Sequence, residues 1–102
     1  MIKKVSDILP KTEILAQLAE EASELAQAAL KLRRALDGTN PTPKSVEECR
    51  NAFEEEYADV MVCIVALGAS DDEKAHGQIE FVVSEKYYRW IHRLQDKEQS
   101  DE

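Results

Sequence analysis

The chain has 102 residues, of which 43% are hydrophobic, and this length suits one ordered domain spanning residues 1–102 rather than two separate cores. Acidic residues outnumber basic ones by 21 to 13, and the formal net charge of −8 argues against a nucleic acid polymer as a partner. The sequence shows neither a signal core nor a membrane span, and its two cysteines form no paired motif. We therefore expect a cytoplasmic protein with reduced thiols and no membrane association.

The first long element is predicted between Thr12 and Leu36, where apolar residues recur at three- and four-residue intervals. This spacing indicates one amphipathic helix, and Gly38 is expected to end it. The preceding segment, Lys3 to Leu9, allows a short additional helix. The following segment, 38–44, contains two prolines and several turn formers, so it predicts a loop between helices.

Two further long helices are predicted after this loop. The sequence Ser45-Val-Glu-Glu48 is a capping box, so a helix is expected to begin there and to run to Gly68. A second capping box, Ser70-Asp-Asp-Glu73, predicts the start of a third helix, with Gly77 as a kink or a late start. Residues 96–102 are polar and are expected to fray.

The sequence thus predicts an all-α fold with its core in residues 12–95 and a polar C-terminal tail. Strand-like alternation and internal repeats are missing from the sequence. Because three amphipathic helices make a thin monomer, we expect dimerisation or higher assembly to complete a helical bundle.

Four carboxylates stand out on the first two predicted helices. Glu21 and Glu24 are three residues apart, so they project from adjacent turns on one face of the first helix. Glu56 and Asp59 repeat this spacing on the second helix, and each pair borders an apolar stripe. Carboxylates gathered at a helix interface need a cation between them, and oxygen ligands favour Mg²⁺, with Mn²⁺ as a substitute, and phosphate substrates.

The third predicted helix carries basic residues beside its apolar stripe. Lys86, Arg89 and Arg93 fall on one flank, where they are candidates for binding phosphate oxygens. They are equally compatible with a solvated face near the helix C-terminus.

The acidic pairs occur in the segments EEASEL, residues 20–25, and EEYADVMVCIVAL, residues 55–67, which resemble the ExxE and ExxD motifs of the MazG-like superfamily. The likeness covers roughly residues 12 to 95. It implies that Glu21, Glu24, Glu56 and Asp59 hold magnesium, with Glu20 and Glu55 beside the ligands. It also implies hydrolysis of a nucleoside triphosphate to the monophosphate and pyrophosphate, in an active site built by helices of a homodimer or homotetramer.

Within this scheme, Glu20 and Glu21 are the expected catalytic residues, with Glu20 as a carboxylate that accepts a proton from the attacking water. Tyr88 is the expected candidate for stacking on a base, since Tyr87 and Trp90 lie on the apolar stripe itself. Phosphoribosyl-ATP pyrophosphohydrolases and all-α dUTPases use similar carboxylates, so base and sugar preference stay open.

Two other readings compete with this one. A di-iron bundle also uses helical carboxylates, but Glu73-Lys-Ala-His76 is a single ExxH where that class needs two. A non-catalytic helical dimer, acting as a regulatory or adaptor protein, needs only the apolar stripes and leaves the carboxylates solvated. Substitution of Asp59 distinguishes them, because removing a half-buried acid stabilises a simple bundle, whereas an enzyme loses metal and activity.

Overall fold

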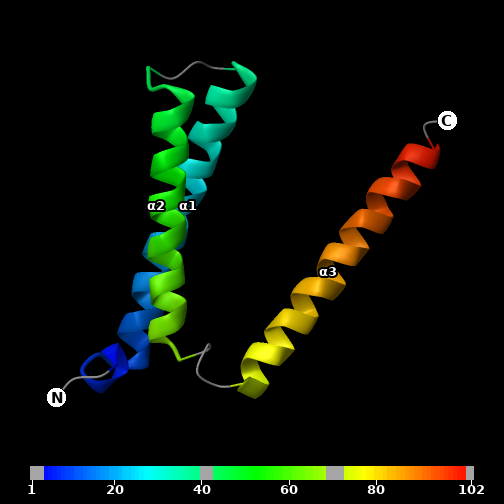
Figure 1. Cartoon of the computed structure of the whole chain (residues 1–102). Coiled ribbons are helices and arrows are strands. Elements are labelled where there is room, and N and C mark those ends of the chain that lie inside the picture. The colour runs from blue at the N-terminus through cyan, green and yellow to red at the C-terminus, as the bar shows by residue number, and fades with distance from the viewer. Residues whose placement is uncertain (1–3, 40–42, 69–72, 101–102) are drawn as a thin grey trace. The chain divides into compact units, whose positions relative to one another are not determined.

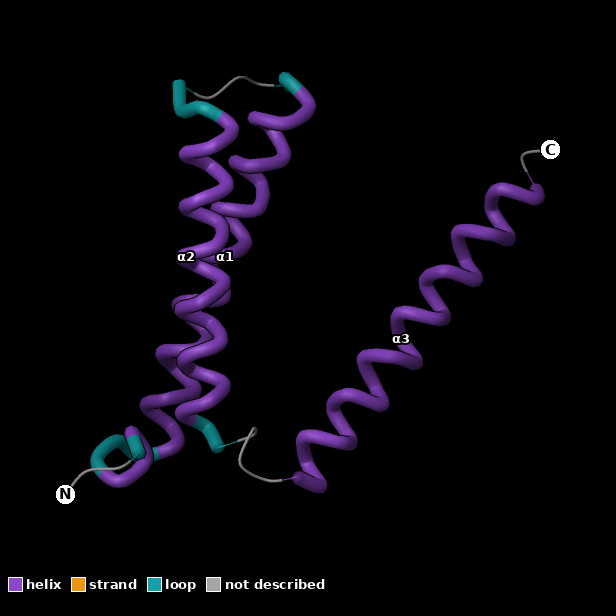
Figure 2. Tube along the Cα trace, viewed as in Figure 1, coloured by secondary structure: helices purple, strands orange, loops and turns teal. Residues whose placement is uncertain are grey.

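The computed structural model describes residues 4–39, 43–68 and 73–100 (Figure 1). Its elements are a short 3₁₀ helix, η1 (Val5–Asp7), and three long helices, α1 (Lys11–Asp37), α2 (Val46–Ala66) and α3 (Glu73–Ser100). No strand occurs within these described ranges, as Figure 2 shows. The predicted all-α fold with three long helices and a short N-terminal one is therefore confirmed.

Helix α1 is bounded by Pro10 at its start and by Gly38 at its end. Pro10 precedes it in an extended conformation, and its carbonyl accepts the amides of Glu13 and Ile14 at 3.0 and 3.2 Å. Gly38 follows the helix with a φ of 73°, and its amide donates to the carbonyl of Arg34. This left-handed residue ends the helix as the sequence predicted, because glycine adopts a positive φ without steric cost.

Helix α2 starts at the predicted capping box. The amide of Glu48 donates to the Ser45 hydroxyl at 3.1 Å, and the amide of Ser45 donates to the Glu48 carboxylate at 3.3 Å. These two bonds satisfy amides that have no partner in the first turn of a helix. At the other end, Gly68 has a φ of 77°, so α2 also stops at the predicted glycine.

The structure divides into two units, residues 1–68 and residues 69–102. In the first unit, α1 and α2 lie side by side and antiparallel along most of their length (Figures 1 and 2). Four side chains are buried among the described residues: Ile14, Ala28, Cys49 and Cys63. The core of this helical hairpin is therefore a narrow seam of mostly small residues.

The second unit contains α3. The helix is continuous through Gly77, so neither the predicted kink nor the late start occurs there. Of the tail predicted to fray, residues 96–102, the part from Asp96 to Ser100 belongs to α3, and residues 101–102 lie outside the described residues. The helix propensity of Lys, Glu and Gln is consistent with this extension. The second predicted capping box, residues 70–73, lies largely outside the described residues.

The three long helices in the described ranges are polar or charged along much of their length. None of them combines the length and the apolar character that crossing a bilayer demands.

Candidate metal centre

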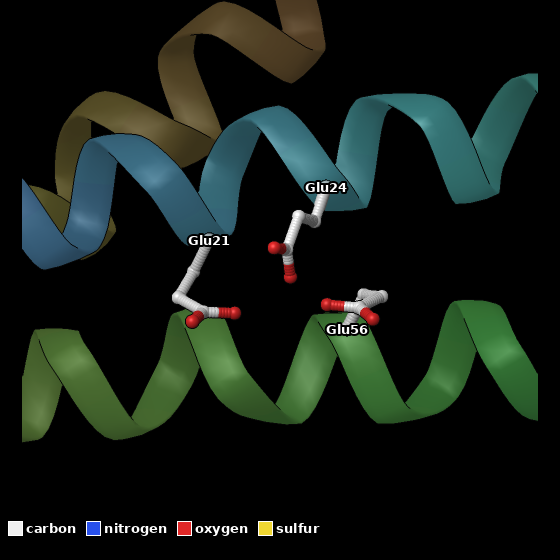
Figure 3. A group of neighbouring side chains, drawn as sticks. All are labelled: Glu21, Glu24 and Glu56. Atoms are coloured by element: carbon white, nitrogen blue, oxygen red, sulfur yellow. The ribbon is translucent and has the colours of Figure 1, made fainter.

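The antiparallel pairing of α1 and α2 sets the two acidic motifs opposite each other. Glu24 of α1 and Glu56 of α2 point toward one another across the helix interface, and Glu21 reaches across to α2 one turn away (Figure 3). Because α1 and α2 run in opposite directions, the residue three positions before Glu24 on α1 lies level with the residue three positions after Glu56 on α2. Glu21 therefore falls at the level of Asp59, and ExxE faces ExxD.

Three of the four predicted ligands form a compact group. Glu21, Glu24 and Glu56 each offer one carboxylate oxygen, and these oxygens all lie within 4.8 Å of one another. Two oxygens bound to one Mg²⁺ are separated by about 3 Å when adjacent and about 4 Å when opposite, for bonds of roughly 2.1 Å. The three oxygens lie close to that spacing, and carboxylate oxygens are the ligands that a hard divalent ion prefers, so the donor set fits such an ion.

Two oxygens at this site have no hydrogen-bond partner. They are Oε2 of Glu21 and Oε2 of Glu56, and both atoms are inaccessible to solvent. The other oxygen of Glu21 accepts a bond from Nε2 of Gln17 at 2.9 Å, which holds the carboxylate toward the interface. Because a covered carboxylate oxygen without a partner is costly, the unpaired atoms support a ligand that is positively charged.

Crowding of the acids raises their affinity for protons. The pKa of Glu24 is raised above its ordinary value of 4.5, mainly by its hydrogen bond with Glu56 and by the charge of that residue. The pKa of Glu21 is also raised, first by loss of solvent around the carboxyl group and then by the charges of Glu24, Asp59 and Glu20. Mutual repulsion and loss of solvent thus both disfavour the charged forms of these carboxyl groups.

Asp59, the fourth predicted ligand, is half-buried on α2 but lies outside the group of three oxygens. Its charge nevertheless raises the pKa of Glu21. It also contributes, after burial and the charge of Glu21, to raising the pKa of the Cys63 thiol. Asp59 therefore borders the centre at the Cys63 end, where burial and negative charge disfavour the Cys63 thiolate.

Glu20, the predicted proton acceptor, is exposed on α1, and its charge raises the pKa of both Glu21 and Glu24. Glu55, the corresponding residue before Glu56, is also exposed. Glu20 therefore acts on the group electrostatically while its own carboxylate is open to water.

The basic residues predicted for phosphate share one surface of α3. Lys86, Arg89 and Arg93 line a shallow hollow on this helix together with His92 and Asp96. Tyr88, the predicted base-stacking residue, is exposed, and its ring lies 6.1 Å from that of His92. These side chains belong to the second unit, whereas the carboxylate group belongs to the first.

Two features of the site were not predicted from the sequence. Gln17 orients Glu21, and its position four residues earlier on the helix was the available signal. Lys31 and Lys44 line a groove that also contains Glu24 and Glu56. Lys31 lies seven residues after Glu24, which is two helical turns and the same face, but Lys44 is brought near only by the hairpin.

Comparison with known proteins gave no match to a family model, to a curated protein or to a solved structure. The likeness to the MazG-like motifs accordingly rests on the residues of the two acidic segments, and the centre itself is defined by the geometry of three carboxylates between α1 and α2.

Proposed function

We propose that this protein is a magnesium-dependent pyrophosphohydrolase that converts a nucleoside or deoxynucleoside triphosphate to the monophosphate and pyrophosphate, in the manner of the MazG-like superfamily. The observation that carries the proposal is the group of three carboxylates, Glu21, Glu24 and Glu56, with two oxygens that have no hydrogen-bond partner. The residues match the superfamily's ExxE and ExxD motifs. Control of the nucleotide pool is the corresponding biological role.

In this proposal the three glutamates hold the ion, and Asp59 completes the acidic face from α2. When bound, magnesium supplies charge stabilisation to the phosphate oxygens. Glu20, which is exposed beside the group, accepts the proton of a water that attacks the α-phosphorus. The bond from the α-phosphorus to the bridging oxygen breaks, and pyrophosphate leaves with that oxygen.

We also propose that the chain works as a homodimer or a larger assembly. The supporting observation is the number of large apolar side chains that remain exposed on both units, against four buried residues in the described ranges. Exposed apolar surface on this scale is typical of helices that bury it against further helices.

The function is tested with a panel of nucleoside and deoxynucleoside triphosphates, with and without magnesium, by measuring monophosphate and pyrophosphate. Wild type is expected to turn over at least one nucleotide only when magnesium is present. Asp59→Asn and Glu56→Gln are expected to lower kcat/KM at least about 100-fold, since even residues beside metal ligands commonly cost 10–100-fold. Glu54→Gln, an exposed acid on the same helix, is the matched control and should keep full activity.

The exposed apolar surface also suits a non-catalytic helical dimer with a regulatory or adaptor role. That function predicts no turnover of any nucleotide, no effect of magnesium on stability, and an Asp59→Asn variant at least as stable as wild type. These three results together would replace the enzyme proposal with the adaptor.

A further inference from the structure

A groove of about 380 Å³ runs between α1 and α2 beside the candidate metal centre. We call it the α1–α2 groove. Its α1 wall consists of residues 24, 27, 28 and 31, and its α2 wall of residues 49, 52 and 56, with Lys44 in the segment just before α2. These intervals of three, four and seven place each set on one helix face, so the walls are two facing stripes.

The charges in the α1–α2 groove are separated along its length. Glu24 and Glu56 face each other at the end next to the metal centre. Lys31 lies two turns further along α1, about 10 Å by helical rise. Lys44 lies in the segment that leads into α2, so both lysines belong to the end of the hairpin away from Glu21. The small residues Ala28 and Ala52 line the groove between the two charged ends, and Cys49 lines it at the level of Lys31.

We infer that the α1–α2 groove binds the pyrophosphate end of the triphosphate substrate, with Lys31 and Lys44 contacting its terminal phosphate oxygens. This inference rests on the proposed function and specifies which part of the substrate occupies the groove. A triphosphate whose α-phosphate lies at the carboxylates extends its β- and γ-phosphates away from them. Within the groove, the positive charges that can compensate this negative charge are those of Lys31 and Lys44.

The chemistry of the groove selects a phosphate chain held together with a divalent ion. An anion alone would be repelled by Glu24 and Glu56, so its binding requires a cation at the carboxylate end. Ammonium groups are compact charges that bind phosphate oxygens without a fixed orientation, which suits a flexible chain of phosphates. A monophosphate is too short to reach from the carboxylates to the lysines, so its affinity should not depend on the lysines.

The inference is tested by calorimetric titration of the full-length protein with three probes: inorganic pyrophosphate, a deoxynucleoside triphosphate with a non-hydrolysable α,β-imido link, and the corresponding monophosphate. Each is titrated with and without magnesium. Pyrophosphate and the imido analogue should bind only with magnesium. Lys31→Gln and Lys44→Gln should each weaken both by about tenfold, and leave the binding of magnesium alone and of the monophosphate unchanged.

Lys11→Gln is the matched control, because Lys11 is exposed at the opposite end of α1 and should have no effect. Unchanged affinity for pyrophosphate in both groove variants would overturn the inference, even if wild type hydrolyses nucleotides. A loss confined to the imido analogue would also overturn it, since the groove would then contact the nucleoside part. Lysine-dependent pyrophosphate binding without turnover of any nucleotide would uphold the groove as a phosphate-chain site and overturn the proposed enzyme.

Discussion

At the scale of single residues, the contact between Glu24 and Glu56 is the central feature of the hairpin. The closeness of the two carboxyl groups is the main cause of the raised pKa of Glu24. The sequence alone predicted that these two acids and Glu21 would meet. It could not predict that Oε2 of Glu21 and Oε2 of Glu56 would be covered and without a hydrogen-bond partner, because this depends on how α1 and α2 pack.

Replacing one member of the contact should separate stability from metal binding. Glu56→Gln keeps the shape of the side chain and removes a negative charge, so we expect a higher melting temperature than wild type in EDTA. The same variant should lose most of the stabilisation that wild type gains from magnesium. A ligand stabilises the folded state to an extent set by its affinity for that state, and removing a ligating carboxylate lowers the affinity for magnesium. Thermal unfolding followed by circular dichroism, with and without magnesium, measures both effects.

Glu54→Gln serves as the control, since it removes an exposed charge from the same helix. An equal magnesium response in wild type and Glu56→Gln would show that Glu56 is not a ligand.

The raised pKa values of Glu21 and Glu24 also predict how stability depends on pH. Above their ordinary pKa of 4.5, the unfolded chain releases these protons more readily than the folded one. Their contribution to the free energy of unfolding is thus present at acidic pH and lost as pH rises through the raised values. Urea unfolding in EDTA at a series of pH values should show a shallower decline for Glu24→Gln than for wild type.

Magnesium should reverse this dependence, because protons compete with the ion for the same carboxylates. Stabilisation by magnesium is expected to grow as pH rises from 5 to 7. A stabilisation that stays constant over this range would argue against direct carboxylate ligation.

At the scale of elements, the helix ends followed from local chemistry. The Ser45 capping box and the two glycines with positive φ were predicted from the sequence because each acts within a few residues. The continuity of α3 through Gly77 and Asp96 was not predicted from the sequence. A single glycine or a run of polar residues is tolerated in a helix when the neighbouring residues have high helix propensity. The groove lysines were missed because the register of α1 against α2 is a property of packing.

The glycines provide opposite tests of this reasoning. Gly77→Ala should raise the free energy of unfolding by about 0.5–1 kcal/mol, because glycine is poor in a helix interior. Gly38→Ala should lower it by about 1–2 kcal/mol, since alanine is strained at the observed φ of 73°. An added Cβ meets no atom within 4 Å at either position, so backbone conformation alone separates the two variants. Urea unfolding measures both, and a loss at Gly77 would contradict the assignment of that residue to a helix interior.

At the scale of the whole molecule, the described helices leave much apolar surface in contact with water. In the first unit Tyr57 is 54% exposed and Val65 is 53% exposed, and they lie with Met61 on one face of α2. The sequence predicted that some apolar surface would stay exposed, since three amphipathic helices cannot bury all their apolar faces in one thin bundle. It could not predict which residues remain uncovered, because that depends on the pairing of α1 with α2.

A charge on this face should therefore disrupt self-association. Val65→Asp is expected to shift the protein toward monomer and to lower its melting temperature, since an assembled interface would have to bury the new carboxylate. Sedimentation velocity over a range of concentrations measures the shift. Asn51→Asp, an exposed polar position on the same helix, is the control, and equal oligomeric states for the two variants would place the interface elsewhere.

The three carboxylates of the candidate centre come from a single helical hairpin within one chain. Bringing them together is an intramolecular event, governed by closure of one short connection rather than by encounter of separate molecules. The affinity of the proposed centre for an ion should therefore not change with protein concentration as long as the hairpin stays folded. In the proposed enzyme, assembly would therefore depend on the abundance of the chain, whereas metal occupancy would depend on the free concentration of the ion.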